Sequence, residues 1–360
     1  MSKSWKDKST KIRKGEELNF KNLERFLKQE WPDLEGRLLV EQFPSGFSNL
    51  TYLVKMGARQ FVLRRPPFGA KIKSAHDMGR EYKILSALSR SYAKVPKPIL
   101  YTEDEDIIGA PFYLMERVEG VILRAKMPEA MQPNPDKMHG IAKGVVDTMV
   151  ELHQVDYEAA GLGELGKPEG YVMRQIEGWT KRYVKSKTNE VASIEKVAKW
   201  LQENMPKESG AALIHNDFKY DNLILDANDW TKVVAVLDWE MSTLGDPLMD
   251  LGTTIGYWVN QNDPDWMQQM ALSPTTLPGN PSRGELVQMY AEKSGRQIDN
   301  IVFYYVYGIF KIAVISQQIF YRFKMGDTED KRFAALGGVV KGLGAMSMQA
   351  IEKGRIDDLF

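Results

Sequence analysis

The sequence predicts an α+β protein with a small antiparallel β-rich N-terminal lobe and a larger, mostly helical C-terminal lobe. Strand patterns dominate before residue 117, with one helix inserted among them. After that point the apolar periodicity becomes helical, except around one short hairpin. With 360 residues and 43% hydrophobic content, the chain can bury two such lobes. We predict that the N-terminal lobe comprises residues 16–117 and the C-terminal lobe residues 118–360. Ligands are expected to bind in a cleft between the two lobes.

The N-terminal lobe follows a lysine-rich stretch, residues 1–15, which has few apolar groups and is expected to be a flexible tail. Apolar residues at helical spacing then predict a helix over 18–31. A second helix is predicted over 74–89, where Met78, Tyr82 and Leu85 form one stripe. The predicted strands of this lobe are 38–43, 51–56, 60–65, 99–102 and 111–116.

The C-terminal lobe is expected to be helical apart from two apolar runs, 223–225 and 233–237. These runs flank the turn 226–229 and predict a β-hairpin. Asp246 before Pro247 is a good N-cap for a further helix, because proline is favoured at the first helical position. The other predicted helices are 138–153, 171–186, 194–205, 283–294, 301–323 and 332–353.

The amino-acid composition argues against several classes of function. Lys+Arg and Asp+Glu balance at 48 each, so no overall charge attracts nucleic acid or a membrane surface. Cysteine is absent, which excludes disulfides and cysteine-ligated zinc, and only four histidines remain for another zinc site. The N-terminus lacks the apolar run of a signal peptide, and the apolar stretch 301–315 is interrupted by Lys311. We therefore expect a cytoplasmic protein without nucleic-acid or membrane partners.

The segment 213–225, followed by 233–240, carries the strongest functional signal. It sets Asp217, Lys219, Asn222 and Asp238 in the order that phosphoryl transfer requires. One carboxylate receives or orients a hydroxyl proton, the lysine meets the phosphate, and the amide and second carboxylate hold Mg²⁺. The five-residue step from Asp217 to Asn222 equals that of the protein-kinase catalytic loop. A lone His-x-Asp occurs by chance, but this joint pattern is far harder to obtain by accident.

Neighbouring polar residues are interpreted as supports of this segment. Asp250 could accept backbone N–H groups of the catalytic loop, and His215 is expected to brace that loop rather than to act as a base. Glu240 could orient the loop or reach the metal through water.

A short loop between the first two strands is a candidate phosphate-binding element. Its small residues would let backbone N–H groups approach a phosphate closely, although an ordinary hairpin turn remains the alternative. No G-K-[ST] follows it, so it is not a P-loop. The candidate residues are Ser45, Gly46, Phe47, Ser48 and Asn49.

Two further elements are candidates for nucleotide binding. Arg64 ends a predicted strand and could bind phosphate while pairing with Glu81 of the next helix; a solvated surface pair is the alternative. Arg65 should point to the other face of the strand. Glu116 C=O and Val118 N–H, where the chain leaves the N-terminal lobe, could meet an adenine edge, or this segment could be a plain connector.

On these residues the chain resembles the aminoglycoside phosphotransferase (APH) family of small-molecule kinases, and in particular its branch fused to acyl-CoA dehydrogenases. The resemblance covers about residues 20–350. Its matching segments are 46–54, 61–65, 80–82, 114–120, 152–156, 214–225 and 236–251.

The resemblance implies a protein-kinase-like fold, ATP (GTP in some members) with Mg²⁺, and phosphorylation of a substrate hydroxyl. By position, Asp217 corresponds to the catalytic base, while Asn222 and Asp238 correspond to the metal ligands. Arg64 stands where many members have lysine, and Asn216 where antibiotic-modifying members often have glycine.

Few residues separate Asp238 from the Gly-Asp-Pro turn that ends at Pro247, so the long activation segment that docks a peptide is missing and a small substrate is expected. Its site should include aromatic residues and a lysine that could pair a carboxylate or phosphate, as in a hydroxyacyl or CoA-like ligand. Aromatic residues in such a helix are, however, more often core than pocket. An aminoglycoside would prefer acidic groups, for which Asp263 and Asp265 are the candidates. The candidate substrate residues are Tyr257, Trp258, Tyr307 and Lys311.

Three alternatives stay open at this point. They are a non-catalytic nucleotide-binding pseudokinase, an aminoglycoside-type antibiotic kinase and a metal-dependent phosphatase. Retention of Asp217, Asn222 and Asp238 together argues against the first, and the lack of a two-metal cluster in the sequence argues against the last.

Overall fold

A computed structural model describes residues 8–44, 49–69, 77–125, 127–328 and 330–360. The chain forms two compact units. The first, which we call the sheet unit, comprises residues 1–122, 159–162 and 223–240. The second, the helical unit, comprises 123–158, 163–222 and 241–360.

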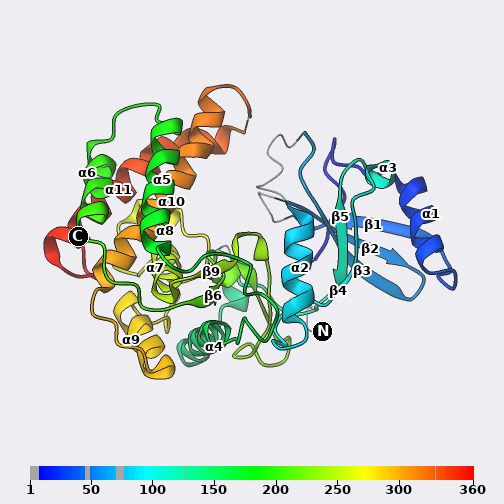
Figure 1. The fold of residues 1–360 in the computed structure, drawn as a ribbon, viewed down its shortest axis with the longest axis horizontal. Coiled ribbons are helices and arrows are strands. Elements are labelled where there is room, and N and C mark those ends of the chain that lie inside the picture. The colour runs from blue at the N-terminus through cyan, green and yellow to red at the C-terminus, as the bar shows by residue number, and fades with distance from the viewer. Residues whose placement is uncertain (1–7, 45–48, 70–76, 126, 329) are drawn as a thin grey trace. The chain divides into compact units, whose positions relative to one another are not determined.

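The sheet unit is built on a five-stranded antiparallel sheet with the order β1-β2-β3-β5-β4. Helix α2 runs alongside β4 and β5 (Figure 1), while α1 and the short α3 lie together by the sheet. The strands are β1 (Leu38–Gln42), β2 (Leu50–Met56), β3 (Arg59–Arg65), β4 (Pro98–Thr102) and β5 (Phe112–Glu116), and the helices are α1 (Phe20–Glu30), α2 (Met78–Leu88) and α3 (Glu105–Ile108).

Alternation along the strands builds the core of this unit. Tyr52 and Val54 of β2 are buried with Leu63 of β3, because residues two apart share a face of the sheet. Leu23 and Leu27 of α1 complete the same cluster. The five predicted strands are thus confirmed, and no end is shifted by more than one residue.

The N-terminal part of this unit differs from the expected flexible tail. Thr10 exchanges two backbone hydrogen bonds of 2.8 Å with Gln42. It therefore forms an antiparallel bridge to the edge strand β1. A charge-rich composition did not reveal this pairing, because an edge strand offers backbone groups to any extended segment regardless of its side chains. Residues 1–7 lie outside the described part.

The predicted hairpin is confirmed and belongs to the sheet unit. Strand β7 (Leu223–Leu225) pairs antiparallel with β8 (Val233–Val236), and Leu223 faces Val236. Leu225 also exchanges backbone hydrogen bonds of 2.9 and 2.8 Å with Val121.

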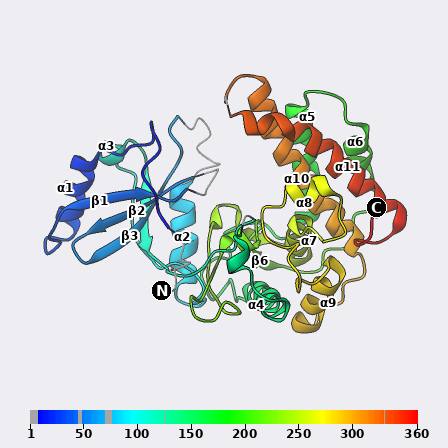
Figure 2. The same cartoon turned by 180° about the vertical axis from the view of Figure 1, so that it is seen from behind.

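In its described residues, the helical unit is formed by helices with one short strand pair. Helices α5, α6, α10 and α11 lie together in both views of the ribbon (Figures 1 and 2). The helices are α4 (Pro135–His153), α5 (Tyr171–Ser186), α6 (Ala192–Glu203), α7 (Pro247–Tyr257), α8 (Asp265–Gln269), α9 (Arg283–Ser294), α10 (Ile301–Lys324) and α11 (Leu336–Lys353). The strands are β6 (Ala212–Ile214) and β9 (Thr243–Gly245), which pair antiparallel.

The start of α7 follows the predicted capping chemistry. The side chain of Asp246 accepts the backbone N–H of Leu248 at 2.8 Å, and Pro247 occupies the first turn. Asp246 also accepts the N–H and hydroxyl of Ser209 at 2.7 and 2.6 Å, which ties the cap to the segment before β6. The pairing of β6 with β9 was not predicted, since three-residue strands carry too little periodicity to detect.

Two helical stretches of the described chain are long and apolar enough to cross a membrane by length and composition, Ile301–Lys324 and Lys331–Lys353. In the first, 72% of the apolar window is buried inside the protein, and in the second 33%. Most of the apolar window of α10 is therefore covered by the protein itself.

Candidate active site

The catalytic loop follows β6 and is held by a carboxylate from α7. Asp250 accepts the backbone N–H of His215 at 2.8 Å and that of Asn216 at 2.7 Å. Asn216 has φ of 66°, a left-handed conformation that asparagine adopts more readily than most residues other than glycine. The predicted support of the loop by Asp250 is therefore confirmed, and the conformation accounts for asparagine at this position.

Asp250 is itself fixed inside the helical unit. It is fully buried, and Nε2 of His153 lies 3.1 Å from its carboxylate. Nδ1 of His153 is paired in turn with the hydroxyl of Tyr290 at 2.7 Å. Burial alone would raise the pKa of Asp250, but the hydrogen bond and charge of His153 lower it below the usual value. Asp250 thus stays ionised and can accept both loop N–H groups.

Three neighbours hold Asp217. Nζ of Lys219 lies 2.5 Å from its carboxylate, and the side-chain amide of Asn222 donates to its Oδ2 and its backbone carbonyl, both at 2.8 Å. Nδ1 of His215 accepts the backbone N–H of Asp217 at 3.3 Å, which agrees with a bracing role for this histidine. Three predicted site residues therefore converge within one loop.

Lys219 remains charged in this setting. Burial alone would lower its pKa, but the Asp217 carboxylate, followed by Tyr257 and Asp221, raises it above the usual value. The Lys219 ammonium lies 4.9 Å from the centre of the Tyr257 ring. A positive charge and a phenol consequently stand beside the Asp217 carboxylate.

The sheet unit carries a second polar cluster, centred on Arg64. Its guanidinium contacts Asp238 at 2.7 Å and Glu81 at 3.3 Å, and Glu240 lies at 3.9 Å. The predicted Arg64–Glu81 pair is thus present. Burial would lower the pKa of Arg64, but the carboxylates of Glu81 and Asp238 raise it well above its usual value.

Arg65 turns to the opposite face of the strand, as predicted, where it donates to the carbonyl of Ile108 at 2.9 Å.

The segment Asp238-Trp239-Glu240 is attached to this cluster at each residue. Asp238 has φ of 67°, and its carboxylate meets Arg64. Glu81 accepts the backbone N–H of Trp239 at 3.2 Å. Asn49 donates to the Glu240 carboxylate at 2.6 Å. These contacts support the predicted orienting role of Glu240.

Each unit, taken by itself, carries oxygen donors of the kind that a hard divalent cation prefers. The amide nitrogen of Asn222 is occupied by Asp217, so its side-chain oxygen is the atom that can face a metal. Three carboxylates surround the one guanidinium of Arg64, an excess of negative charge that a cation would offset. Among the described residues, no group of three or more His, Cys, Asp or Glu side chains forms a metal cage by itself. Magnesium sites in nucleotide enzymes do not need one, because phosphate and water complete the shell.

Four of the predicted phosphate-loop residues lie outside the described part of the chain: Ser45, Gly46, Phe47 and Ser48. Asn49 is described and buried. Glu116 ends β5, and Val118 follows it in an irregular segment.

The predicted substrate residues have different surroundings. Tyr257 lies beside Lys219. Trp258 is buried and donates its indole N–H to the carbonyl of Pro281 at 2.9 Å. Tyr307 is fully buried on α10. Lys311 is buried as well, and its ammonium donates to the carbonyl of Asn216 at 2.6 Å. Burial favours the core interpretation for Trp258 and Tyr307.

Several contacts of the catalytic loop leave no signal in the sequence. The hydroxyl of Tyr171 and the side-chain amide of Asn216 are hydrogen-bonded at 3.0 to 3.1 Å, and Asn216 also donates to the carbonyl of Met241 at 3.1 Å. Lys311 reaches Asn216 from 95 residues away. The signal that the sequence offers for Lys311 is a lysine interrupting an apolar helix, a pattern that also fits the predicted substrate contact.

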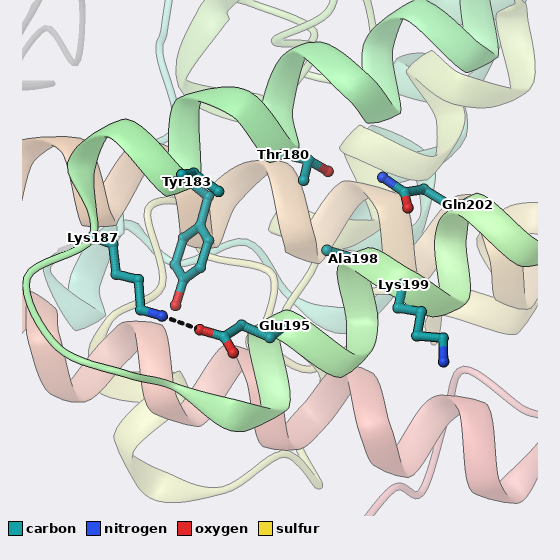
Figure 3. A pocket seen from close by; sticks show the side chains of 8 residues that line it. Thr180, Tyr183, Lys187, Glu195, Ala198, Lys199 and Gln202 are labelled. Carbon is teal, nitrogen blue, oxygen red and sulfur yellow. Dashed lines mark hydrogen bonds and ion pairs between the residues drawn. The ribbon is translucent and has the colours of Figure 1, made fainter.

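A surface depression of about 320 Å³ lies between α5 and α6 (Figure 3). The ion pair between Lys187 and Glu195 spans part of it at 2.5 Å. None of its lining residues is among the predicted site residues.

Known proteins resemble this chain in sequence over most of its length. The model of the phosphotransferase enzyme family (APH) matches residues 39–283. Acyl-CoA dehydrogenase family member 10 of Mus musculus is 33% identical over 314 residues, which cover 87% of this chain and 29% of the relative. The chain spans under half the length of the curated relatives that it matches.

Solved structures show the same fold. A Ralstonia eutropha protein, provisionally described as an aminoglycoside phosphotransferase, has a TM-score of 0.77 and 30% identity, covering 94% of this chain and 99% of its own. The GDP complex of aminoglycoside 2'-phosphotransferase-IIIa has a TM-score of 0.61 and 16% identity, covering 91% and 99%. The α+β fold class, with an antiparallel N-terminal sheet and a helical C-terminal region, is confirmed. Together with the family match over residues 39–283, these results show that the chain belongs to the phosphotransferase enzyme family.

Proposed function

We propose that the protein transfers the terminal phosphoryl group of ATP, with Mg²⁺, to a hydroxyl group of a small molecule. The observation that carries the proposal is the arrangement of Asp217. Its loop is held by Asp250 at two successive N–H groups, and its side chain is oriented by Lys219 and Asn222. Such rigid placement suits a reaction that depends on positioning and electrostatics.

In the proposed reaction, the acceptor oxygen forms a bond to the terminal phosphorus while the bond to the departing nucleoside diphosphate breaks. Asp217 orients the acceptor hydroxyl and takes its proton. The proton transfer comes late, because the loose transition state gains little from a strong base. Lys219, charged beside Asp217, would stabilise the negative charge of the phosphoryl group.

Asn222 and Asp238 are the proposed magnesium ligands. Their amide and carboxylate oxygens are of the kind that Mg²⁺ prefers. The bound ion would neutralise phosphate charge. Arg64 would hold nucleotide phosphates while its contacts with Glu81 and Asp238 fix the guanidinium.

The remaining nucleotide contacts are proposed for residues 45–49 and for the backbone of Glu116 and Val118. Guanine nucleotides are a specific alternative to ATP, because the aminoglycoside 2'-phosphotransferase-IIIa structure is a GDP complex.

We propose a hydroxyacyl compound or a related metabolite as the acceptor, supported by the relatives named as acyl-CoA dehydrogenase family members. An aminoglycoside acceptor would need acidic partners. Asp263, one of the two candidates, already binds the guanidinium of Arg283 and the backbone N–H of Asn260. This engagement disfavours the antibiotic alternative.

The test measures nucleoside diphosphate release with Mg²⁺ and a panel of hydroxyacyl-CoA thioesters, hydroxy acids, sugars and aminoglycosides. With the best acceptor, Asp217→Asn should lower kcat by about 10²-fold or more, because the base is lost, while nucleotide affinity is largely retained. Asp226→Asn is the control, since Asp226 lies in the exposed hairpin turn. Wild-type kcat in Asp217→Asn would refute the assignment, and nucleotide binding without turnover on any acceptor would favour the pseudokinase alternative.

A further inference from the structure

Lys311 is a buried cation inside an otherwise apolar stretch of α10. Its residue is 1% exposed. Burying an ammonium group costs free energy unless it is paired or hydrogen-bonded. The structure gives it a strong acceptor: Nζ lies 2.6 Å from the backbone carbonyl of Asn216 and 3.5 Å from its side-chain oxygen.

The carbonyl that Lys311 contacts belongs to the peptide bond joining Asn216 to Asp217. Rotation of that peptide plane would change the direction of the Asp217 carboxylate. Asn216 is held in the left-handed conformation by contacts on its other atoms, namely Asp250 at its N–H and Tyr171 at its side chain. Lys311 contributes the contact to the carbonyl itself.

Helix α10 is suited to hold a side chain in place. It packs against α7, which carries Asp250, and the backbones approach closely at Gly308 and Gly252. Gly308 is three residues before Lys311, so the two lie on neighbouring positions of one helix face. The helix that delivers the ammonium therefore rests directly on the helix that holds the loop N–H groups.

We propose that Lys311 is a positioning residue, whose ammonium fixes the Asn216–Asp217 peptide plane and thereby aims the Asp217 carboxylate at the acceptor. The inference rests on the proposed function for its catalytic consequence, but the structural role is independent of it. Lys311 then has no direct contact with substrate, in contrast to the role expected from the sequence.

The charge state of Lys311 should make turnover depend on pH. Burial lowers its pKa to about 8; Asp217 and Asp250 oppose this change, while Lys219 and Arg182 add to it. As pH rises through about 8, the ammonium becomes an amine, a weaker donor to the carbonyl. Turnover should therefore decline on the alkaline side.

As pH rises, the free energy of unfolding should increase while turnover declines. The pKa of Lys311 is about 8 in the folded protein, against 10.5 for an ordinary lysine. The unfolded chain thus binds more protons between these values, so the contribution of this group to the free energy of unfolding increases as pH rises from about 8 to 10.5. A simple loss of folding cannot produce this combination of lower turnover and greater stability.

The test compares Lys311→Met, which has no donor, with Lys311→Gln, which keeps a neutral donor. Lys324→Met is the matched control, because Lys324 is exposed in the last turn of the same helix. Lys311→Met should lower kcat by about tenfold or more through misplacement of the base, with nucleotide Kd unchanged. Lys311→Gln should retain more of kcat and lose the alkaline decline that titration of Lys311 causes.

Hydrogen exchange over residues 213–222 provides a readout that does not need turnover. Faster exchange there in Lys311→Met, but not in Lys324→Met, is expected even if no acceptor for the wild-type protein is found, which separates this inference from the proposed function. If Lys311→Met does not fold, Lys311→Gln carries the test through its pH profile. Wild-type kcat, pH profile and exchange in the folded variants would overturn the proposal.

Discussion

Arg64 shows how one residue can satisfy two demands at once. It stands where lysine is expected from the resemblance, and its fork-shaped guanidinium reaches both Glu81 and Asp238. A lysine ammonium, as a single point charge, could not offer two separate nitrogen atoms in this way. The arginine therefore links the α2 carboxylate to the candidate metal ligand within the sheet unit.

Arg64→Met should strongly destabilise the protein, because it leaves Glu81 buried without its cation. We expect a loss of about 3–5 kcal/mol in the free energy of unfolding, measured by urea denaturation at pH 7. Arg59→Met is the control: its pair with Asp33 is exposed, and the change should cost under about 1 kcal/mol.

The same variant should show a defined pH dependence. Burial raises the pKa of Glu81 above its ordinary 4.5, an effect that Arg64 partly opposes. A raised carboxyl pKa costs stability as pH rises above 4.5, and loss of Arg64 increases that cost. The deficit of Arg64→Met should accordingly shrink near pH 4.5. An equal deficit at both pH values would contradict the assignment to Glu81.

At the scale of elements, glycines set the contact between α7 and α10. A Cβ on Gly308 would overlap the backbone carbonyl of Gly252, and one on Gly252 would overlap that of Tyr304. The two helices can approach this closely because neither has a side chain at the crossing. The sequence shows both helices by their apolar residues but does not show where they cross.

Gly308→Ala should destabilise the helical unit by overpacking. Backbone, unlike a flexible side chain, cannot move aside, so a loss of about 1–3 kcal/mol is expected in thermal or urea unfolding. Gly338→Ala in α11 is the control, because no atom lies within 4 Å of its added Cβ and alanine favours helix. Unchanged stability in Gly308→Ala would show that the helices separate at little cost.

At the scale of the whole molecule, ligand binding should appear as a gain in stability. ATP with Mg²⁺ at about 100 times its Kd should add about 2.7 kcal/mol to the free energy of unfolding. Asp238→Asn should remove most of the Mg²⁺-dependent part, because a carboxylate ligand is lost, whereas Asp229→Asn in the hairpin turn should retain it. Thermal unfolding with ATP, in the presence and absence of Mg²⁺, measures the Mg²⁺-dependent gain in stability. A full Mg²⁺-dependent gain in Asp238→Asn would argue against Asp238 as a metal ligand.

Much of the fold followed from the sequence because its signals are local. Strand alternation, helical spacing and the Asp-Pro cap of α7 act over a few residues, so the five strands and the long helices could be predicted within a few residues of their ends. The motif from Asp217 to Asn222 lies within one loop, and its internal contacts need no distant partner.

Tertiary structure decided which distant groups meet. Lys311 donates to the carbonyl of Asn216, Arg64 forms an ion pair with Asp238, and Thr10 pairs with Gln42. A buried charge or an open strand edge must be satisfied by whatever packing brings beside it, and that partner is set by the approach of elements rather than by spacing along the chain. The sequence by itself thus predicted phosphoryl transfer around Asp217, while tertiary structure determined how that carboxylate is held.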